Sequence, residues 1–343
     1  MTDDKKPLAS QEADLPKSES GAAARIGNAP LYAAGVYARD VQETAGHYQR
    51  VFGVEPQDFG TPTPSEPNRA AVSLNMHVVF FPNFYVKIQQ PISPNGPYAA
   101  GLRNHGMSIQ NIQLHVDGTV EHIQAVRAEM ERRGGKWTLG VETDFRAYVD
   151  FKKELGITLE PIAMRLRRDP VVVPGLTAPP LGTAPVTHVG FAVTDVHAAA
   201  RAYSEIFGIA MPEIVEIRDP EYPPGADWNT SARLRVARWR QGEIGIELIE
   251  SMGDPTPWSE FVKASKGNAA QVIGFDVGDR MEEVLRDLQS KGGKWIYGSR
   301  GGDTAYLDFM DTLGFVIQIT GSPESDTSKV AGDRGKAAHI GFV

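Results

Sequence analysis

One motif occurs twice in the sequence, and this repeat constrains the fold more than any other feature. The stretches RGGKWTLG, from residue 133, and KGGKWIYG, from residue 291, are nearly identical. Trp137 and Trp295 are 158 positions apart. Ala147 and Ala305 have the same spacing, so the match continues without a gap. Such internal similarity indicates that one structural unit is present twice.

The segments that precede the motif also correspond. LYAAGVYARDV, from residue 31, resembles VTHVGFAVTDV, from residue 186, and a helix-like run ending in Phe-Gly follows each of them. A stretch rich in proline and glycine separates the two copies, which is typical of a linker. We therefore predict a flexible tail at 1–28, a first domain at 29–165, a linker at 166–184, a second domain at 185–321 and a C-terminal tail at 322–343.

Each copy divides again into a strand, a helix and further strands. In the second copy, THVGFAVTDV alternates small or polar residues with bulky ones, as a half-buried strand does, and HAAARAYSEIFG has helical spacing. Two strand-like runs, SARLRVARWR and GEIGIELIES, come next, and the order then restarts with QVIGFDV. The pattern predicts an α+β fold in which the strand-helix-strands unit occurs twice in each domain.

These runs resemble the vicinal oxygen chelate superfamily, which includes glyoxalase, bleomycin-resistance and extradiol-dioxygenase-like proteins. The resemblance rests on HVGFAVTD with its following helix, on IELIES and on the KGGKW to LGF ending, and it covers residues 30–165 and 185–320. It implies two tandem domains, each a pair of βαβββ modules that curl a mixed sheet around a cavity. The superfamily carries isomerases, lyases, dioxygenases and metal-free binding proteins on one scaffold, so the resemblance implies no single reaction.

Composition and charge restrict the partners. The 343 residues are 41% apolar and carry a net charge of -8, which disfavours nucleic acid as the main partner. No apolar run approaches the roughly 20 residues of a membrane-spanning helix. The N-terminus lacks the apolar core of a secretory signal. We expect a cytoplasmic protein with a small-molecule substrate and no nucleic-acid or membrane partner, and homo-oligomerisation is left open.

The resemblance places metal ligands at fixed strand positions, and the second domain fills three of them with His188, Glu247 and Gln318. Strand alternation independently puts each of the three on the face expected to line the cavity. Imidazole, carboxylate and amide oxygen can together hold Fe2+, Mn2+, Ni2+ or Zn2+. Val272 occupies the fourth position, where many relatives have histidine, and a valine cannot be a ligand. We predict a divalent metal site here, and the alternative is that these are ordinary strand residues.

The predicted function is metal-assisted isomerisation, epimerisation or elimination of a small oxygen-bearing substrate. The ion would polarise a carbonyl or enolate oxygen while Glu247 or Asp276 moves a proton. For Asp276 the alternative is a solvated or hydrogen-bonded strand residue. Trp228 lies in a turn-rich segment that is either a lid over the cavity or a packed surface loop. Two other functions stay open: an extradiol-type ring-cleaving dioxygenase with atypical ligands, and a metal-free small-molecule binding protein.

The first domain differs at the corresponding positions, which are occupied by Ala33, Lys87, Asn111 and Glu160. An ammonium among them would repel a cation, so no metal is predicted in this domain. Two interpretations remain. Either Lys87 and Glu160 form an ion pair that fills a vestigial metal site, or they line a metal-free polar pocket for an anionic ligand together with Asn111 and His115.

Overall fold

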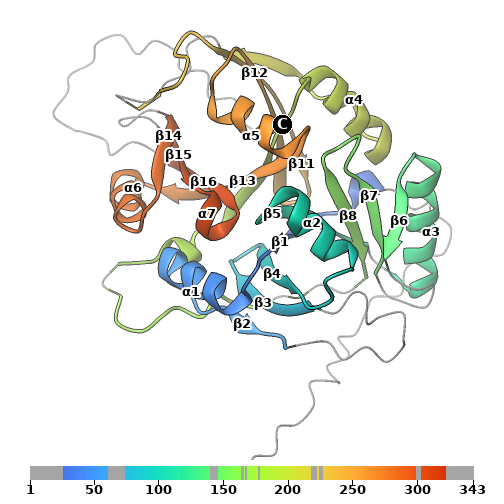
Figure 1. Cartoon of the computed structure of the whole chain (residues 1–343), viewed down its shortest axis with the longest axis horizontal. Coiled ribbons are helices and arrows are strands. Elements are labelled where there is room, and N and C mark those ends of the chain that lie inside the picture. Colours follow the sequence, from blue (N-terminus) through green and yellow to red (C-terminus); the bar gives the residue numbers. More distant parts are fainter. Residues whose placement is uncertain are drawn as a thin grey trace, which may run out of the picture.

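Two eight-stranded mixed sheets of the same topology make up the protein (Figure 1). The computed structural model describes residues 26–60, 74–116, 118–139, 146–163, 166, 168–176, 178–217, 222–223, 227–298 and 303–321. The strand orders are β2-β3-β4-β1-β5-β8-β7-β6 and β10-β11-β12-β9-β13-β16-β15-β14. The predicted α+β class with tandem domains is thereby confirmed, and we call the halves built on these sheets the first and second domains.

The elements of the first domain are η1 (Ile26–Asn28), β1 (Leu31–Tyr37), α1 (Val41–Phe52), β2 (Gln57–Asp58), β3 (Leu74–Phe80), β4 (Tyr85–Pro91), α2 (Pro97–His105), β5 (Ser108–His115), α3 (Val120–Arg132), β6 (Lys136–Leu139), β7 (Tyr148–Phe151) and β8 (Ile157–Ile162). Those that follow are η3 (Leu181–Thr183), β9 (Val186–Ala192), α4 (Val196–Phe207), β10 (Ile214–Ile217), β11 (Arg233–Gln241), β12 (Ile244–Met252), α5 (Pro257–Ser265), β13 (Ala269–Gly278), α6 (Met281–Ser290), β14 (Lys294–Gly298), β15 (Thr304–Phe309), α7 (Met310–Leu313) and β16 (Phe315–Gly321).

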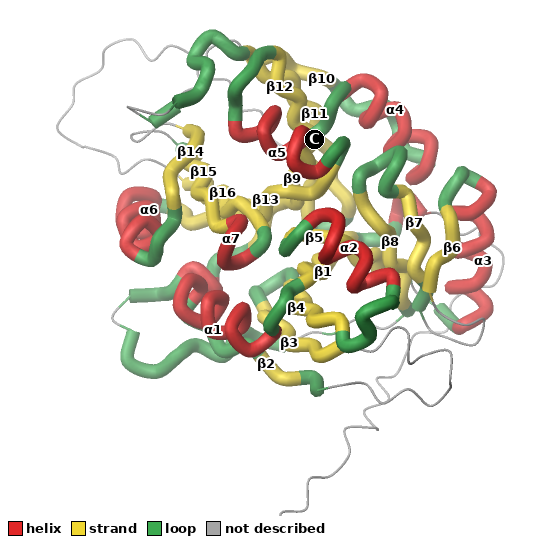
Figure 2. The backbone as a smooth tube through the Cα atoms, viewed as in Figure 1, coloured by secondary structure: helices red, strands yellow, loops and turns green. Residues whose placement is uncertain are grey.

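Each sheet consists of two βαβββ modules joined through their first strands. β1 pairs antiparallel with β5, and β9 pairs antiparallel with β13. Alternation along β9 directs Val189 and Phe191 into the main core with the helices, while Ala192 joins a second cluster on the opposite face. Helices α2 and α5 connect the modules and contact the strands at the sheet centres, as the tube in Figure 2 shows.

Local sequence explains where the first helix of each domain begins and ends. The side chain of Asp195 accepts a hydrogen bond from the backbone N–H of Ala198, which satisfies one of the free donors at the start of α4. Gly208 ends this helix with φ 70°, a left-handed conformation that glycine adopts without strain. Asp40 and Gly53 do the same for α1, so the repeat extends to the caps.

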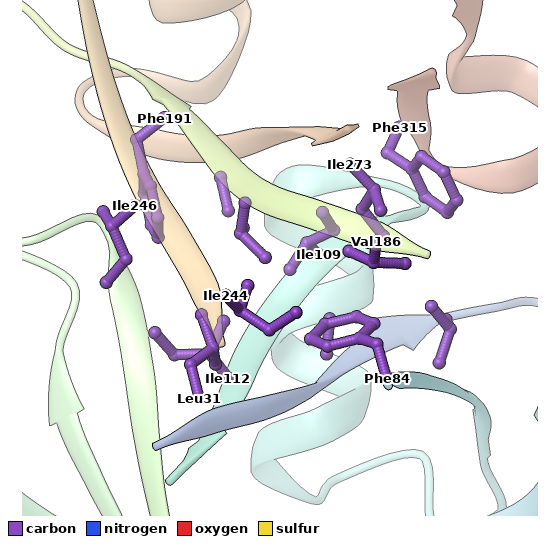
Figure 3. Close-up of a cluster of buried hydrophobic side chains, with 14 of the residues drawn as sticks. Leu31, Phe84, Ile109, Ile112, Val186, Phe191, Ile244, Ile246, Ile273 and Phe315 are labelled. Carbon is purple, nitrogen blue, oxygen red and sulfur yellow. The ribbon is translucent and has the colours of Figure 1, made fainter. Parts of the chain in front are cut away.

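The two domains share one hydrophobic core. Figure 3 shows side chains of both domains in a single buried cluster. Phe52 and Phe81 of the first domain contact Phe275 of the second, with ring centroids 5.6 and 5.2 Å apart. Because this apolar surface is buried only when the halves are packed together, we expect the domains to depend on each other for stability.

Hydrogen bonds related by an approximate twofold reinforce the interface. Arg133, at the end of α3, donates to the carbonyl of Ile206 at the end of α4, over 2.7 Å. Lys291, at the end of α6, donates to the carbonyl of Val51 at the end of α1, over 3.2 Å. Cations therefore occupy the negative ends of the two helix dipoles, each supplied by the other domain.

Two hairpins, β3–β4 and β11–β12, each carry an amide side chain near their turn that hydrogen-bonds the backbone at the start of the other domain. The amide side chain of Asn83 donates to the carbonyl of Val186 and accepts from its N–H, both over 2.9 Å. The amide of Gln241 donates to three backbone carbonyls, those of Ile26, Gly27 and Ala29. Residues 26–28, which were assigned to the flexible tail, thus form a turn that is fixed against the second domain.

The rest of the predicted N-terminal tail, 1–25, and the predicted C-terminal tail, 322–343, lie outside the described residues. Part of the predicted linker packs on the end of α1, where Val172 forms a bridge with Val54. Among the described residues, no helix has the length and apolar character needed to span a membrane.

Candidate functional site

The structure brings the three predicted metal ligands of the second domain together. His188 lies on β9, Glu247 on β12 and Gln318 on β16, and all three side chains are buried. The Nε2 atom of His188 is 2.6 Å from Oε1 of Gln318 and 3.6 Å from Oε2 of Glu247. Gly274 of β13 pairs with His188 on one side and with Gln318 on the other, and any larger side chain there would overlap the imidazole.

Two further residues complete this cluster, and the sequence analysis did not identify them. Arg238 lies opposite Glu247 in the β11–β12 hairpin, and its Nε donates to Oε1 of Glu247 over 2.6 Å. A terminal nitrogen of the same guanidinium also pairs with that oxygen. The hydroxyl of Tyr306 donates to Oε2 over 3.4 Å. The buried carboxylate is therefore compensated by a positive charge, without which it would be strongly destabilising.

The signal for Arg238 was present in the sequence. Gln241 pairs with Ile244 across the two-residue turn, so counting three positions outward places Arg238 opposite Glu247. Tyr306 lies opposite Gln318. It could have been found because it occupies the position of Tyr148 in the repeat, although a short helix, α7, makes the register harder to count.

Burial and charge set the protonation states in the cluster. Burial lowers the pKa of His188, and the nearby Glu247 carboxylate opposes this effect only in part, so the imidazole is neutral. Burial alone would raise the pKa of Glu247, but the charge of Arg238 and the hydrogen bonds to the carboxylate hold this pKa below its ordinary value. The hydroxyl of Tyr306 stays protonated because burial raises its pKa well above the usual range.

Hydrogen bonding selects the tautomer of His188. The amide oxygen of Gln318 can only accept, so Nε2 carries the proton in this arrangement, and Nδ1 accepts from the hydroxyl of Thr187 over 2.9 Å. A metal needs the lone pair of Nε2 instead. In the metal-binding form the imidazole proton would be on Nδ1. The Thr187 hydroxyl could then accept a hydrogen bond from Nδ1–H, because a hydroxyl is both donor and acceptor.

The residues fit a divalent ion with three protein ligands. A neutral imidazole, an ionised carboxylate and an amide oxygen lie within one small cluster, and Arg238 holds the far oxygen of Glu247 and leaves Oε2 toward His188. Gln318 is required as the third ligand, because the described ranges contain no group of three or more His, Cys, Asp or Glu residues that could hold a metal. Arg238 cancels the charge of the carboxylate, which makes this a weaker site than one with a free carboxylate.

Aromatic side chains cover the cluster on the concave face of the sheet. The ring of Trp258 lies 5.2 Å from those of Tyr297 and Tyr306, and Tyr222 lies 5.6 Å from Tyr297. Trp258 is 2% exposed, and its indole N–H has no hydrogen-bond acceptor among the described residues. Val272 belongs to the same apolar cluster and lies against Gly190, beside Glu247. The site is thus a polar floor beneath an aromatic layer.

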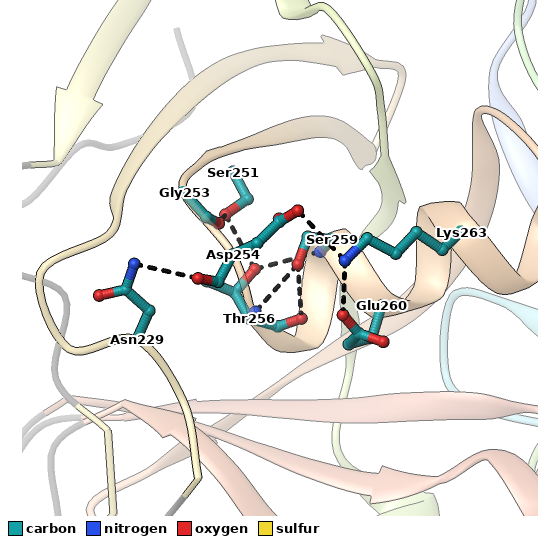
Figure 4. A network of polar contacts seen from close by, with 8 residues as sticks. All are labelled: Asn229, Ser251, Gly253, Asp254, Thr256, Ser259, Glu260 and Lys263. Atoms are coloured by element: carbon teal, nitrogen blue, oxygen red, sulfur yellow. Dashed lines mark hydrogen bonds and ion pairs between the residues drawn. The ribbon is translucent and has the colours of Figure 1, made fainter.

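The start of α5 holds Trp258 in this layer. Thr256 and Ser259 form a capping box, with hydrogen bonds of 2.9 and 3.1 Å. The Thr256 hydroxyl also donates to Ser251 at the end of β12, over 2.8 Å. Figure 4 shows this network together with Lys263, which pairs with Asp254 over 3.1 Å. The helix is therefore anchored at its N-terminal end, next to Trp258.

The structure does not bring two other predicted residues to the cluster. Asp276 is exposed near the end of β13, and its carboxylate accepts a hydrogen bond from the N–H of Gly278 over 3.0 Å. It therefore stabilises the end of the strand. Trp228 is half-buried in the segment before β11 and is not part of the aromatic layer around Trp258. Parts of that segment, 218–221 and 224–226, lie outside the described residues.

An ion pair occupies the equivalent position in the first domain. Lys87 and Glu160 are both buried and in direct contact. Burial lowers the pKa of Lys87, and the charge of Glu160 opposes this shift. Gln113 donates to Glu160 over 2.6 Å and accepts from the hydroxyl of Tyr85 over 2.6 Å. The carboxylate is fully engaged by these partners.

The other two residues named for this domain lie at the border of the network. Asn111 is buried and donates to Gln89 over 3.3 Å. His115 is half-buried at the end of β5, and its ring lies 5.8 Å from that of Tyr32. The Lys87–Glu160 pair and its amide partner Gln113 form the centre of this domain.

Comparison with known proteins agrees with the fold. Residues 187–307 match the family model described as Glyoxalase/Bleomycin resistance protein/Dioxygenase superfamily. A variant of 4-hydroxymandelate synthase from Streptomyces coelicolor is similar in structure, with a TM-score of 0.60, 15% identity, and coverage of 86% of this chain and 92% of that one. A xylose isomerase-like TIM barrel/4-hydroxyphenylpyruvate dioxygenase fusion protein gives a TM-score of 0.50 at 13% identity, covering 91% of this chain and 50% of that one. A search of curated protein sequences found no match.

Residues 187–307, which lie in the second domain, therefore match the glyoxalase/bleomycin resistance/dioxygenase superfamily, also called the vicinal oxygen chelate superfamily. The two sheets of equal topology show that the same fold occurs twice in the chain. At 15% identity the structural similarity establishes the fold and not the reaction.

Replacing His188 by Gln should flatten the dependence of stability on pH. The folded protein keeps His188 neutral, whereas the unfolded chain binds a proton there below about pH 6.5. Stability is therefore lost as the pH falls through this value, by up to about 1.4 kcal/mol per pH unit for one proton. Urea unfolding at pH 7.5, 6.5 and 5.5 should show a smaller loss in His188→Gln. His197→Gln, on the exposed face of α4, is the control, and equal slopes in wild type and His188→Gln would contradict this assignment.

Replacing Lys87 by Met tests whether the ion pair is structural. Removing only the cation leaves Glu160 charged and buried, at a cost of about 3–5 kcal/mol. The double variant Lys87→Met/Glu160→Gln should recover much of this loss, measured by urea unfolding. A loss below about 1 kcal/mol for Lys87→Met, combined with lost binding of an anionic ligand, would instead favour the polar pocket.

Proposed function

We propose that the second domain is the functional domain and that it catalyses isomerisation, epimerisation or elimination of a small oxygen-bearing substrate by proton transfer. The observation that carries the proposal is the convergence of His188, Glu247 and Gln318 beneath an aromatic layer. In the first domain the same positions are taken up by a completed ion pair, which leaves no base available.

Glu247 is the residue that would move the proton. Arg238 fixes Oε1, so Oε2 is the atom that would accept a proton from the substrate carbon, and the Tyr306 hydroxyl lies beside it. The charge of Arg238 keeps Glu247 ionised but also makes it a weak base, since its pKa is low. The substrate C–H must therefore be acidified by other means.

His188, Glu247 and Gln318 would hold the ion that supplies this activation, and Oε2 of Glu247 would have to leave the ion before that oxygen could accept the proton. A divalent ion bound there would act as a Lewis acid on a carbonyl or enolate oxygen of the substrate. The surrounding residues would orient the substrate and exclude water. A planar or aromatic substrate would pack best against Trp258 and Tyr297, and the aromatic layer would have to open to admit it because Trp258 is only 2% exposed. Val272 supplies an apolar wall next to Glu247.

Two alternatives receive unequal support. Oxygen-activating enzymes with two histidines and a carboxylate need ligands where this chain has Val272 and Gln318, so ring cleavage by dioxygen is disfavoured by residue type. A metal-free binding protein is favoured by one observation: the charges of Arg238 and Glu247 already cancel. We retain it as the second candidate.

Metal titration of the full chain tests the proposal. Protein purified without chelators and then incubated with Fe2+, Mn2+, Ni2+ or Zn2+ should retain about one ion per chain by elemental analysis. His188→Ala and Glu247→Ala should abolish retention, because each removes a principal donor. Gln318→Ala should weaken it by about tenfold, since a neutral amide is the poorest of the three donors. Circular dichroism verifies that each variant is folded.

A gain of affinity provides the sharper control. Gln318→Glu supplies a second carboxylate without removing any ligand, so it should tighten metal binding by about tenfold or more. His197→Ala, an exposed histidine on α4, should leave binding unchanged. If neither wild type nor Gln318→Glu retains an ion while a small aromatic or carboxylic ligand still binds, the Lewis-acid function is wrong and the metal-free binding protein replaces it.

A further inference from the structure

Each domain places an aromatic residue at the start of the helix that connects its two modules. Trp258 follows Pro257 at the start of α5, and Tyr98 follows Pro97 at the start of α2. Both helices have nine residues, and both aromatic side chains are buried, with 2% of Trp258 and 4% of Tyr98 exposed. The repeat therefore includes these two residues, which cover the sheets.

Each covering residue packs on a tyrosine of the sheet below it. The ring of Trp258 lies 5.2 Å from that of Tyr306, whose hydroxyl donates to Glu247. The ring of Tyr98 lies 5.9 Å from that of Tyr148, which has the place of Tyr306 in the repeat. Trp258 thus lies directly on a residue that contacts the buried carboxylate. A small molecule can reach Glu247 from this side only when the indole moves.

The two covering residues differ in how their polar groups are satisfied. A hydrogen bond links the hydroxyls of Tyr98 and Tyr148. The indole N–H of Trp258 is buried and has no acceptor in the part of the chain that the structure describes. A buried donor without an acceptor destabilises the closed arrangement, and water would satisfy this donor if the ring swung out. A hydrogen bond therefore holds Tyr98 in place, and none holds Trp258.

The side chain of Trp258, and not the helix, is the part that can move. The capping box of Thr256 and Ser259 anchors the backbone at the start of α5 (Figure 4). Tyr297, whose ring lies 5.2 Å from that of Trp258, is half-buried, so solvent reaches one edge of the aromatic layer. Rotation of the indole about its side-chain bonds would open the layer at this edge and leave the helix in place.

We propose that Trp258 is a gate whose side chain swings outward to admit small molecules to the cluster of His188, Glu247 and Gln318, whereas Tyr98 is a fixed cover in the first domain. Burial of the indole ring favours the closed position, and the unpaired N–H favours opening. The gate concerns access alone, so it does not depend on the proposed reaction or on a bound metal.

Chemical modification of His188 measures how often the gate opens. Diethyl pyrocarbonate reacts with accessible imidazoles, and peptide mass spectrometry of the full chain gives a rate for each histidine. Only 2% of His188 is exposed, so it reacts when the layer opens. The exposed His197 corrects for the amount of reagent. His77, which is buried in the first domain, reports opening of the chain as a whole.

Replacing Trp258 by Tyr should lock the gate, because it repeats the arrangement of Tyr98 and Tyr148. The new hydroxyl can hydrogen-bond Tyr306, so His188 should react more slowly than in wild type. It should also react about fivefold more slowly than in Trp258→Phe, which has the same ring without the hydroxyl. The double variant Trp258→Tyr/Tyr306→Phe should lose this protection. The rate of His77 should be the same in all four proteins.

Two outcomes would overturn the inference. One is an equal rate for His188 in wild type, Trp258→Tyr and Trp258→Phe, since residue 258 would then not control access. The other is a change at His188 that His77 matches, because this would report the stability of the whole chain. Tyr98→Phe is the matched variant of the first domain, and it should leave the rate of His188 unchanged.

Discussion

The buried carboxylate of Glu247 is the constraint on which the second domain depends. It is fully removed from water, so it must be neutralised or strongly hydrogen-bonded. Arg238 provides the charge and occupies one carboxylate oxygen, and this leaves the other oxygen directed toward His188. The anionic state of Glu247 and the weakness of the site for cations follow from this pairing, whereas His188 is neutral because it is buried. Glu247 can therefore act only as a weak base, because its pKa is held below the ordinary value.

The first domain meets the same constraint by a different route. Its buried carboxylate, Glu160, comes from the last strand of the sheet, and the cation, Lys87, comes from the position that Glu247 holds in the second domain. The two sheets have equal topology, and their centres have diverged to opposite charge patterns. Both centres depend on the shared core, because the aromatic contacts between Phe52, Phe81 and Phe275 fix one sheet against the other.

The sequence was sufficient for the fold because the repeat, the strand alternation and the helix caps agree. It also located His188, Glu247 and Gln318, since the side-chain period of a strand decides which face each residue occupies. It did not identify Trp258, because the connecting helix α5 was not predicted, and a helix over a sheet cannot be inferred from strand periodicity. For Asp276 the structure shows the alternative, a solvated and hydrogen-bonded strand residue, because alternation gives the face of a strand but not the point along it at which solvent begins.

Anomalous diffraction from crystals soaked in Mn2+ or Zn2+ tests the central claim most directly. The account predicts one peak per chain, within coordination distance of Nε2 of His188, Oε2 of Glu247 and Oε1 of Gln318. It predicts no peak between Lys87 and Glu160, whose charges already satisfy each other. A peak in the first domain, or an empty cluster in the second domain when soaked at millimolar metal, would contradict the assignment of metal-assisted chemistry to the second domain.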